Sequence, residues 1–282
     1  MIKVSEAHSQ DGYDILSVDA VEERFGIQIL SYDEEDANVR MRMPITALRN
    51  PFTGRVTIGP LPLLVDDSGS TVAYARRGRG WPVTSELTLQ LCHDAAETIE
   101  CSAGSYLTSH AHPIYATEQG ALAACTLMVE DKVIGTATVR TVFVAGGLPK
   151  YERPAETLPK SADLTLAELL AVSPSGDQAG YHVMAQHPDP MIFNASENVH
   201  GGIAATGMEM VGSAAIWEKV GDDFWSGSLQ VNFLRPFVAG TSSHYAGSVA
   251  HAGSTVAVAD AEAIGENGKL AATARLTAYR TA

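Results

Sequence analysis

A histidine, two glycines and a single carboxylate are spaced along one apolar stretch in the C-terminal half of the chain. His200, Gly201 and Gly202 precede a run of Ala, Gly, Ile, Met and Val residues in which Glu209 is the only charged residue before Trp217. Burying an unpaired charge on so apolar a helix is unfavourable, so this acid is expected to be hydrogen-bonded, raised in pKa, or placed in a reactive cleft. The pattern therefore makes Glu209 a candidate catalytic residue.

A fainter copy of this arrangement lies 143 residues earlier in the chain. Asp66 follows Thr57 by nine residues, as Glu209 follows His200 by nine, and a Gly-Ser pair follows the acid in each copy. Alternating apolar and polar residues, typical of strands, continue downstream in both halves. Because order and spacing match over about 90 residues, the sequence indicates an internal duplication.

Each half carries the same order of expected elements: a short amphipathic opening, a strand, a loop, the apolar helix, and then several long strands. The intervening residues 146–162 are rich in Pro, Gly and charge, which is typical of a linker. We therefore predict an N-terminal domain at 1–145 and a C-terminal domain at 163–282. One helix followed by antiparallel strands predicts an α+β fold, in which the two halves can pair their sheet edges.

The chain of 282 residues is acidic, with a formal net charge of −14, which argues against general binding to nucleic acid or anionic membranes. No apolar run approaches the roughly 18 residues of a membrane span, and no secretory signal is evident, so we expect no membrane insertion.

Cys92, Cys101 and Cys125 lack metal or redox spacing, which indicates a reducing compartment, and cytoplasm is the simplest expectation. His110 and His112 have strand spacing for two ligands, but no third is evident nearby, so no metal or cofactor is predicted.

Arginines form one local exception to the acidic composition. Arg76, Arg77 and Arg79 follow the first apolar helix closely. One interpretation is a solvated, basic helix C-terminus, which the helix dipole favours. The other is a docking point for a phosphate-bearing ligand. Arg235 has the same two interpretations, as a phosphate ligand or as an exposed residue at a strand end.

These residues resemble the hotdog-fold thioesterases, and specifically the phenylacetyl-CoA thioesterase-like branch. That branch has an Asn, a His-Gly-Gly motif and an acid nine positions after the His on the central helix. A Ser or Thr then begins the next strand, which commonly ends in Leu-Arg-Pro. The second half matches this order throughout, with Asn194, His200-Gly201-Gly202, Glu209, Ser226 and Leu234-Arg235-Pro236. The one departure is Glu209, where Asp is usual.

The first half matches the same pattern less closely. It keeps Asp66 and Thr84 at the right spacings, and its Asn50 lies one residue further from the helix. Thr57-Ile58-Gly59 replaces the His-Gly-Gly motif, and Cys92-His93-Asp94 replaces Leu-Arg-Pro. The duplication is also similar to the two-domain acyl-CoA thioesterases, in which one chain supplies what is usually a homodimer. The resemblance implies two tandem hotdog domains, each a long helix wrapped by an antiparallel sheet, paired as an intrachain pseudo-dimer.

The activity that the resemblance implies is hydrolysis of an acyl-CoA to the free acid and CoA, within lipid metabolism. This reaction needs an activated water or a nucleophile, and donors for the developing oxyanion. Backbone N–H groups at a helix N-terminus can be those donors, and Gly201 and Gly202 allow close approach. A helix carboxylate is a candidate general base or nucleophile, two roles between which the sequence does not choose. A hydroxyl from Ser226 or Thr84 can orient the water or the carboxylate.

Each helix acid lies too far from the N-terminus of its own helix to share a substrate carbon with it, since two turns separate them by about 10–13 Å. In the family that the chain resembles, each site is built across the pseudo-dimer interface. The resemblance therefore implies a first site from Asn194, His200 and Gly201 with Asp66 and Thr84. It implies a reciprocal site from Asn50, Ile58 and Gly59 with Glu209 and Ser226. We expect the first to be the more competent, because it joins the usual Asp to an intact His-Gly-Gly motif.

Structural roles remain as alternatives for several of these residues. His200 can simply cap its helix, and the two glycines after it can form a tight turn. Asp67 is expected to be a solvated or capping neighbour of Asp66, because adjacent helix positions face about 100° apart. Gly69 and Gly212 are expected to permit close helix–sheet packing.

Two rival functions also remain. A hotdog hydratase or dehydratase would act on enoyl or hydroxyacyl thioesters, but its Asp-x-Asn-Pro-x-His pattern is absent from the sequence. An acyl-CoA-binding sensor would normally lack the helix acid and carry a DNA-binding extension. The acyl group is not readable, because small residues (Ala204, Ala205, Ala214, Ala215) leave room without setting a length. A homo-oligomer of double units also remains open.

Overall fold

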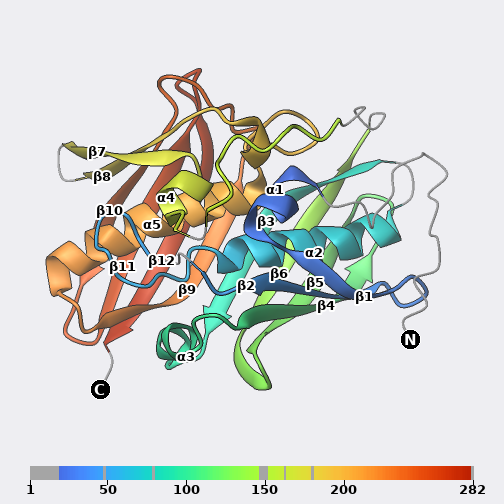
Figure 1. Ribbon diagram of the computed structural model, residues 1–282, viewed down its shortest axis with the longest axis horizontal. Helices are drawn as coiled ribbons and strands as arrows, with labels where there is room; N and C mark the ends of the chain where they lie inside the picture. Colours follow the sequence, from blue (N-terminus) through green and yellow to red (C-terminus); the bar gives the residue numbers. More distant parts are fainter. Residues whose placement is uncertain are drawn as a thin grey trace.

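A single curved antiparallel sheet wraps around two long helices (Figure 1). The computed structural model describes residues 19–46, 49–77, 80–145, 152–161, 163–178 and 181–280. Over these residues the sheet has twelve strands in the order β1-β2-β4-β5-β6-β3-β9-β12-β11-β10-β8-β7. The first six positions belong to the N-terminal half and the last six to the C-terminal half. The predicted α+β fold with two halves joined edge to edge is therefore confirmed.

The two halves contain similar elements in the same order. The N-terminal half comprises α1 (Ala20–Phe25), β1 (Gln28–Asp33), β2 (Asn38–Pro44), α2 (Leu61–Arg76), β3 (Trp81–Leu91), α3 (Ala95–Cys101), β4 (Tyr106–Ala116), β5 (Gly120–Val129) and β6 (Lys132–Val144). The C-terminal half comprises α4 (Leu166–Leu169), β7 (Val172–Gln178), β8 (Tyr181–Gln186), the 3-10 turn η1 (Pro190–Ile192), α5 (Gly201–Val220), β9 (Phe224–Phe233), β10 (His244–Ala252), β11 (Val256–Ile264) and β12 (Leu270–Arg280). The domain boundaries at 145 and 163 stay a prediction.

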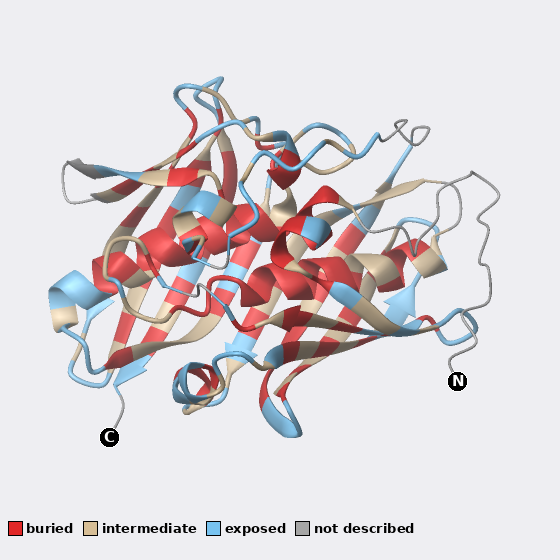
Figure 2. Ribbon diagram, viewed as in Figure 1, coloured by how far each residue is buried: buried red, intermediate tan, exposed pale blue. Residues whose placement is uncertain are grey.

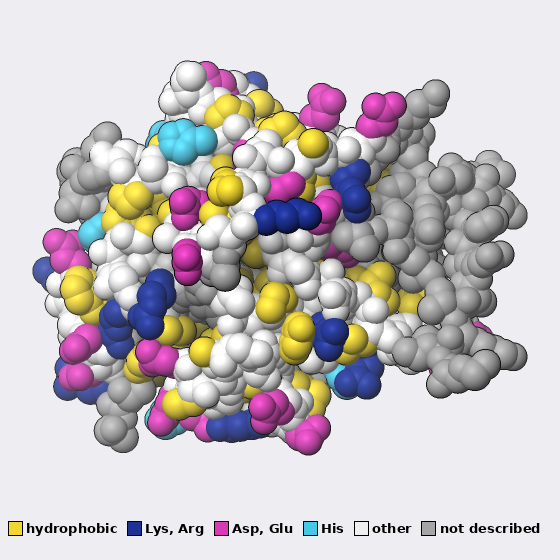
Figure 3. All heavy atoms as spheres, viewed as in Figure 1, with side chains coloured by type: hydrophobic (Ala, Val, Ile, Leu, Met, Phe, Trp, Pro, Cys, Tyr) yellow, Lys and Arg dark blue, Asp and Glu magenta, His cyan; other side chains and the backbone are white. Residues whose placement is uncertain are grey.

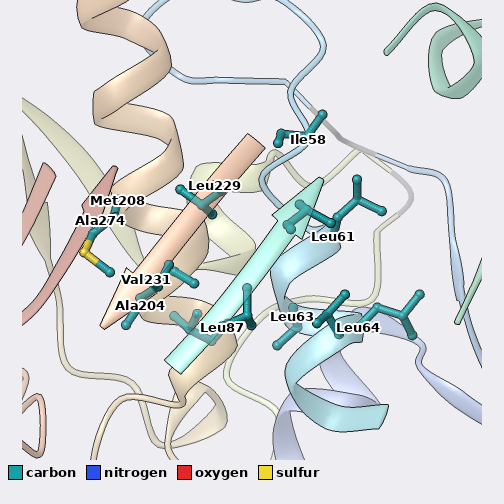
Figure 4. Close-up of a cluster of buried hydrophobic side chains, with 14 of the residues drawn as sticks. Ile58, Leu61, Leu63, Leu64, Leu87, Ala204, Met208, Leu229, Val231 and Ala274 are labelled. Atoms are coloured by element: carbon teal, nitrogen blue, oxygen red, sulfur yellow. The ribbon is translucent and has the colours of Figure 1, made fainter. Parts of the chain in front are cut away.

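The long helices α2 and α5 are the buried centres of their halves. Figure 2 shows both helices buried along most of their length, with exposure at the C-terminal end of α5. A helix that is apolar on all sides is expected to be enclosed, and here the sheet and the other helix cover it. Figure 4 shows where the halves share a core, with Leu87 of β3 and Val231 of β9 close to side chains of both helices. None of the described helices is long and apolar enough to span a membrane.

The seam between the halves is a short stretch of sheet. β3 and β9 pair only from Glu86–Asn232 to Gln90–Ser228, five residue pairs. Beyond these pairs each strand continues with its own half, so the seam opens at both ends. Just past each end a bulge adds one residue, Ser85 in β3 and Gly227 in β9. A bulge re-aims neighbouring side chains, and these two lie directly beside Thr84 and Ser226.

Glycines decide how closely the helices approach their neighbours. A Cβ at Gly69 would lie 2.5 Å from Val139 Cγ2, so this glycine permits close packing of α2 on β6. A Cβ at Gly212 would lie 3.5 Å from the nearest atom, of Leu276, which is ordinary van der Waals contact. The expected packing role is therefore wrong for Gly212, where the sheet leaves room for a side chain.

A buried arginine joins α1 to the C-terminal half. Arg24 donates to Asp189 Oδ2 at 2.8 Å and to Thr157 Oγ1 at 2.7 Å, and it forms an ion pair with Glu156. These contacts tie the first helix to the segment between the halves and to η1. They thereby hold Glu22, on the same short helix, beside the junction of the two halves.

Candidate active site

Each bulge directs a hydroxyl group at the acid of its own half. Thr84 Oγ1 donates to Asp66 Oδ1 at 2.7 Å, and Ser226 Oγ donates to Glu209 Oε1 at 2.9 Å. The two arrangements correspond to one another in the duplicated halves. The hydroxyl and the acid that the family resemblance pairs are therefore in contact in both halves.

The N-terminus of α5 brings the second half to Asp66. His200 Nδ1 lies 3.6 Å from Asp66 Oδ2, and a Cβ added at Gly201 would lie 2.6 Å from the same oxygen. A side chain at position 201 would therefore displace the carboxylate. The structure brings together Asp66, Thr84, His200 and Gly201, the core of the first expected site.

These four residues line a cavity of about 420 Å³. Asp66 is 3 % exposed, and its Oδ1 is held by Thr84 while Oδ2 faces Gly201. Among the described residues, no acceptor for the Gly201 N–H is present, as is usual for the first N–H groups of a helix. A carboxylate oxygen and a backbone donor therefore lie side by side in the cavity.

Gly202 has a different role from Gly201. Its N–H donates to His200 Nδ1 at 3.1 Å, so the histidine does cap α5. A Cβ at Gly202 would lie 2.5 Å from Leu63 Cα, in the backbone of α2. Gly202 thus allows the N-termini of the two helices to meet, and it is not among the residues that line the cavity.

Asn194 lines the cavity from the loop before α5. Its Oδ1 accepts the N–H groups of Ser196 at 2.9 Å and of Asn198 at 3.3 Å, which shapes that loop. No hydrogen bond joins its Nδ2 to another residue within the described part of the chain. The amide nitrogen is thus available to a ligand.

Three acidic residues that the sequence analysis did not assign to the site also line this cavity: Asp19, Glu22 and Asp67. The expectation of a solvated Asp67 is wrong, because its side chain is only 4 % exposed, with Oδ1 3.2 Å from His200 Nε2. Asp67 faces inward because the N-terminal end of α5, where His200 lies, covers that side of α2. Glu22 and Asp19 form a capping box on α1, a local signal that marks a helix start but not a cavity.

Electrostatic interactions dominate around His200. Burial alone lowers its pKa, but the charge and hydrogen bond of Asp67 and the charge of Asp66 outweigh burial and raise the pKa to about 10. Burial raises the pKa of Asp67 to about 6, against the lowering effect of His200. Burial, reinforced by the charge of Asp67, raises the pKa of Glu22 to about 8. A charged histidine among buried carboxyl groups is the result.

The reciprocal set of residues also comes together, but its polar groups are already bound. Glu209 is 1 % exposed, and its second oxygen accepts a hydrogen bond from Thr57. The Thr57 hydroxyl also accepts the Gly59 N–H at 3.1 Å, and a Cβ at Gly59 would lie 3.4 Å from Glu209 Oε2. Ile58 is buried beside them. Burial raises the pKa of Glu209, opposed by hydrogen bonds from Thr57 and Ser226.

Asn50 fastens this reciprocal region to α5. Its Nδ2 donates to the Met210 carbonyl oxygen at 2.8 Å and to Ser213 Oγ at 2.9 Å, and the residue is 2 % exposed. Its Oδ1 accepts the Phe52 N–H at 2.9 Å. Asn50 therefore has both ends of its amide engaged, unlike Asn194.

Of the three candidate phosphate ligands that the structure describes, Arg235 lines the cavity. Arg76 donates to the Glu35 carbonyl oxygen at 2.6 Å, and Arg77 donates to Tyr74 Oη at 2.7 Å and stacks over that ring. Neither lines the cavity, and Arg79 lies outside the described residues. Arg235 is exposed and lines it. On the face shown in Figure 3, acidic and basic side chains of the described residues are interspersed.

Comparison with known proteins gives a match over part of the C-terminal half. Residues 197–272 match the family model of the thioesterase superfamily, a span that includes His200, Glu209 and Ser226. No curated protein gives a significant sequence match to the chain.

Solved structures resemble the whole chain. A tesB protein of Mycobacterium avium subsp. paratuberculosis aligns with a TM-score of 0.64 at 11% identity, covering 93% of this chain and 98% of that one. An acyl-CoA thioesterase II, TesB2, of Mycobacterium marinum aligns with a TM-score of 0.57 at 12% identity, covering 93% and 98%. A 12:0-ACP thioesterase of Umbellularia californica aligns with a TM-score of 0.56 at 10% identity, covering 86% and 94%. The expected resemblance to double hotdog thioesterases is confirmed at the level of the fold.

Proposed function

Since the chain is a double hotdog protein of the thioesterase type, whose residues 197–272 match that superfamily, we propose that it hydrolyses acyl-CoA to a free acid and CoA. The reaction takes place in the cavity that contains Asp66. The observation that carries this proposal is the position of the Asp66 carboxylate, with one oxygen held by Thr84 and the other beside the free Gly201 N–H of the opposite half. A base or nucleophile and an oxyanion donor thus meet at one point.

The chemistry follows from these contacts. Thr84 donates to one Asp66 oxygen, which leaves the other oxygen to accept a proton from water or to attack the thioester carbon. The Gly201 N–H stabilises the carbonyl oxygen as it becomes an oxyanion. In the general-base route, water attacks the acyl carbon, the C–S bond breaks, and the proton taken by Asp66 ends on the CoA thiol. In the nucleophilic route, Asp66 displaces CoA to form an acyl-aspartyl anhydride, and water then hydrolyses that anhydride to the free acid and the Asp66 carboxylate. Label on Asp66 after a single turnover in ¹⁸O-labelled water would show the nucleophilic route with water attacking the Asp66 carboxyl carbon, because the general-base route leaves Asp66 unlabelled.

Substrate binding is proposed from the two kinds of residue in the cavity wall. Tyr74, Trp81, Val83 and Val142 provide apolar surface that suits an acyl group. Arg235 is the one arginine or lysine among the described lining residues, and it provides a positive charge for a CoA phosphate. The Asn194 amide is available for the thioester or the pantetheine arm.

The reciprocal set around Glu209 is proposed to be structural. Both Glu209 oxygens accept hydroxyl hydrogen bonds, and the carboxyl is enclosed. A water molecule would have to displace Thr57 or Ser226 in order to bind there. Turnover is therefore assigned to Asp66.

A thiol-release assay with short, medium, long and aromatic acyl-CoAs tests the proposal. Asp66→Asn should lower kcat by about 10²–10⁴-fold, the usual contribution of a general base. Glu209→Gln should keep most of the activity. If Glu209→Gln alone abolished turnover, the assignment of the active site would be wrong. Water addition to crotonyl-CoA without thiol release, or tight acyl-CoA binding without turnover, would instead favour a hydratase or a sensor.

We also infer that the enzyme acts without a metal or cofactor, in the cytoplasm, within lipid metabolism. The supporting observations are the proposed carboxylate chemistry and three free cysteines. Activity is expected to be unchanged after dialysis against a chelator. A homo-oligomer of double hotdog units remains a prediction, which light scattering would test.

A further inference from the structure

The two ring nitrogens of His200 face the carboxylates of two consecutive residues on α2. Nδ1 lies 3.6 Å from Asp66 Oδ2, and Nε2 lies 3.2 Å from Asp67 Oδ1. All three side chains are largely buried, with exposed fractions of 13% for His200, 5% for Asp66 and 4% for Asp67. The histidine therefore bridges the proposed catalytic acid and a second acid that the reaction scheme has not used.

Asp67 is not explained as a structural residue. Its Oδ2 is buried and has no hydrogen-bond partner among the described residues, so the carboxylate is incompletely satisfied. Burying such a group is unfavourable unless a nearby charge compensates it. The compensating charge available at Oδ1 is that of His200. Asp67 and His200 therefore act as a pair.

The contacts of Nδ1 connect this pair to Asp66. In a neutral ring, Nε2–H points to Asp67 and Nδ1 accepts the Gly202 N–H, 3.1 Å away. In a charged ring, Nδ1 also carries a proton and can no longer accept the Gly202 N–H, and the acceptor beside it is Asp66 Oδ2, 3.6 Å away. The charges that favour this second state come from Asp67 and Asp66 on α2 and from Asp19, the N-cap residue of α1, and together they raise the pKa of His200 to about 10.

A fourth acid on α1 also faces this group. Glu22 has its pKa raised to about 8, chiefly by burial and then by the charge of Asp67. Its carboxyl group is therefore mostly neutral at pH 7. The negative charges near the ring at that pH are consequently those of the three aspartates, of which Asp67 makes the direct contact.

We propose that Asp67 is a positioning residue for thioester hydrolysis, which holds His200 by its Nε2–H and keeps the ring charged beside Asp66. This inference rests on the proposed function. The charged ring places a positive charge next to the oxyanion that forms at Gly201, so it stabilises the transition state without transferring a proton. Asp67 acts only through His200, because its carboxylate contacts the ring on the side away from Asp66.

The test combines an NMR titration of the His200 ring with a pH–rate profile. Asp67→Asn keeps the shape of the side chain and removes its charge, and Asp67→Glu is the conservative control that restores the charge. His200→Gln identifies the ring signal among those of the other histidines. Because the removed charge lies within hydrogen-bonding range, the ring of the Asn variant should lose its proton about 1–3 pH units lower than in the wild type.

Over the same pH range, kcat of Asp67→Asn should fall while KM changes little. In Asp67→Glu, both the pH at which the His200 ring loses its proton and kcat should return at least part of the way to the wild-type values. An unchanged His200 titration in Asp67→Asn would overturn the inference, as would a shifted titration that kcat does not follow. A wild-type protein that hydrolyses no acyl-CoA would contradict the proposed function itself. The NMR arm separates these failures, because it requires no substrate.

Discussion

Asn50 Nδ2 lies 2.8 Å from the carbonyl oxygen of Met210, so a loop of the N-terminal half is bonded to the middle of α5. The corresponding asparagine of the other half, Asn194, uses its Oδ1 within its own loop and lines the cavity. The duplicated motif has therefore diverged in how each loop is held. One copy fastens the halves together, and the other leaves an amide nitrogen available for a ligand.

Asn50→Ala is expected to destabilise the protein. The substitution removes a buried donor to the Met210 carbonyl oxygen and Ser213 Oγ, and the loss of a typical hydrogen bond costs about 0.5–1.5 kcal/mol. Asn194→Ala is the matched control, and it should lower the free energy of unfolding less while reducing kcat/KM. Chemical denaturation and thiol release measure the two effects. Equal stability losses in the two variants would contradict the proposed difference between the loops.

Thr84→Val should reduce activity with little change in fold. The valine is similar in shape but removes the hydrogen bond to Asp66 Oδ1, and a bond to a charged group contributes about 1.5–3 kcal/mol. We therefore expect kcat to fall by about 10–150-fold, since 1.4 kcal/mol corresponds to a factor of ten. Ser226→Ala removes the equivalent bond to Glu209 and should leave kcat within a few-fold of the wild type. A larger loss in the serine variant would place turnover at Glu209.

Gly201→Ala and Gly202→Ala are expected to fail in different ways. The new Cβ at 201 would lie 2.6 Å from Asp66 Oδ2, so the carboxylate must move and kcat should drop at least ten-fold. The new Cβ at 202 would lie 2.5 Å from Leu63 Cα, so the helices must separate, which should destabilise the protein by about 1–3 kcal/mol.

The control for both glycine substitutions is Gly212→Ala. There the Cβ has 3.5 Å of room, and alanine favours a helix over glycine by about 1 kcal/mol, so stability should be unchanged or higher. Thermal unfolding and steady-state kinetics on the three variants separate the effects. A Gly201→Ala variant with full activity would show that Asp66 can work from another position.

Glu22→Gln should change how stability depends on pH. The pKa of Glu22 is raised from 4.5 to about 8 in the folded protein, so its favourable contribution is complete below pH 4.5 and is lost as pH rises through about 8. Glutamine does not titrate, and its oxygen can still accept the Asp19 N–H of the capping box. The variant should therefore gain stability over the wild type between pH 5 and pH 9. Chemical denaturation at pH 5 and pH 9 measures the free energy of unfolding of both proteins. The same difference between variant and wild type at both pH values would contradict the raised pKa of the Glu22 carboxyl.

Arg235→Ala should weaken substrate binding without slowing chemistry. The arginine is exposed at the cavity and takes no part in the proposed reaction at Asp66. Its proposed contact with a CoA phosphate is therefore equally strong in the bound substrate and in the transition state, so KM should rise by about ten-fold with kcat unchanged. Arg76→Ala, outside the cavity, is the matched control. The difference in KM between Arg235→Ala and the wild type should shrink at high salt, because screening weakens an exposed ion pair. A loss of kcat instead of KM would give Arg235 a part in the reaction.

Much of the fold was predictable because the two halves of the sequence repeat similar residue types at matching spacings. The nine-residue spacing from Thr57 to Asp66 and from His200 to Glu209 placed both acids on helices, and alternation placed the strands after them. The pairing of Asp66 with Thr84 was implied by the family resemblance, and the structure brings the two into contact. These are local patterns, which helix and strand geometry translate directly into positions.

Other features depended on packing between segments far apart in the sequence. Nothing local distinguishes Asp67 from a solvated neighbour of Asp66, because its partner His200 comes from a distant part of the sequence. The bulge at Ser85, which aims Thr84, is visible only once β3 has a partner strand. Residues near in space but distant in sequence carry no shared periodic signal.

By itself, the sequence determined that two similar units exist, and which acids, hydroxyls and glycines each can contribute. Only the tertiary structure decided which polar groups are already bound. At Asp66 one carboxylate oxygen lies beside Gly201 at the wall of a cavity, whereas at Glu209 the hydroxyl groups of Thr57 and Ser226 bind both carboxylate oxygens. The reason is physical: a hydrogen bond across the halves depends on atoms brought to within about 3 Å, which folding sets and local sequence does not.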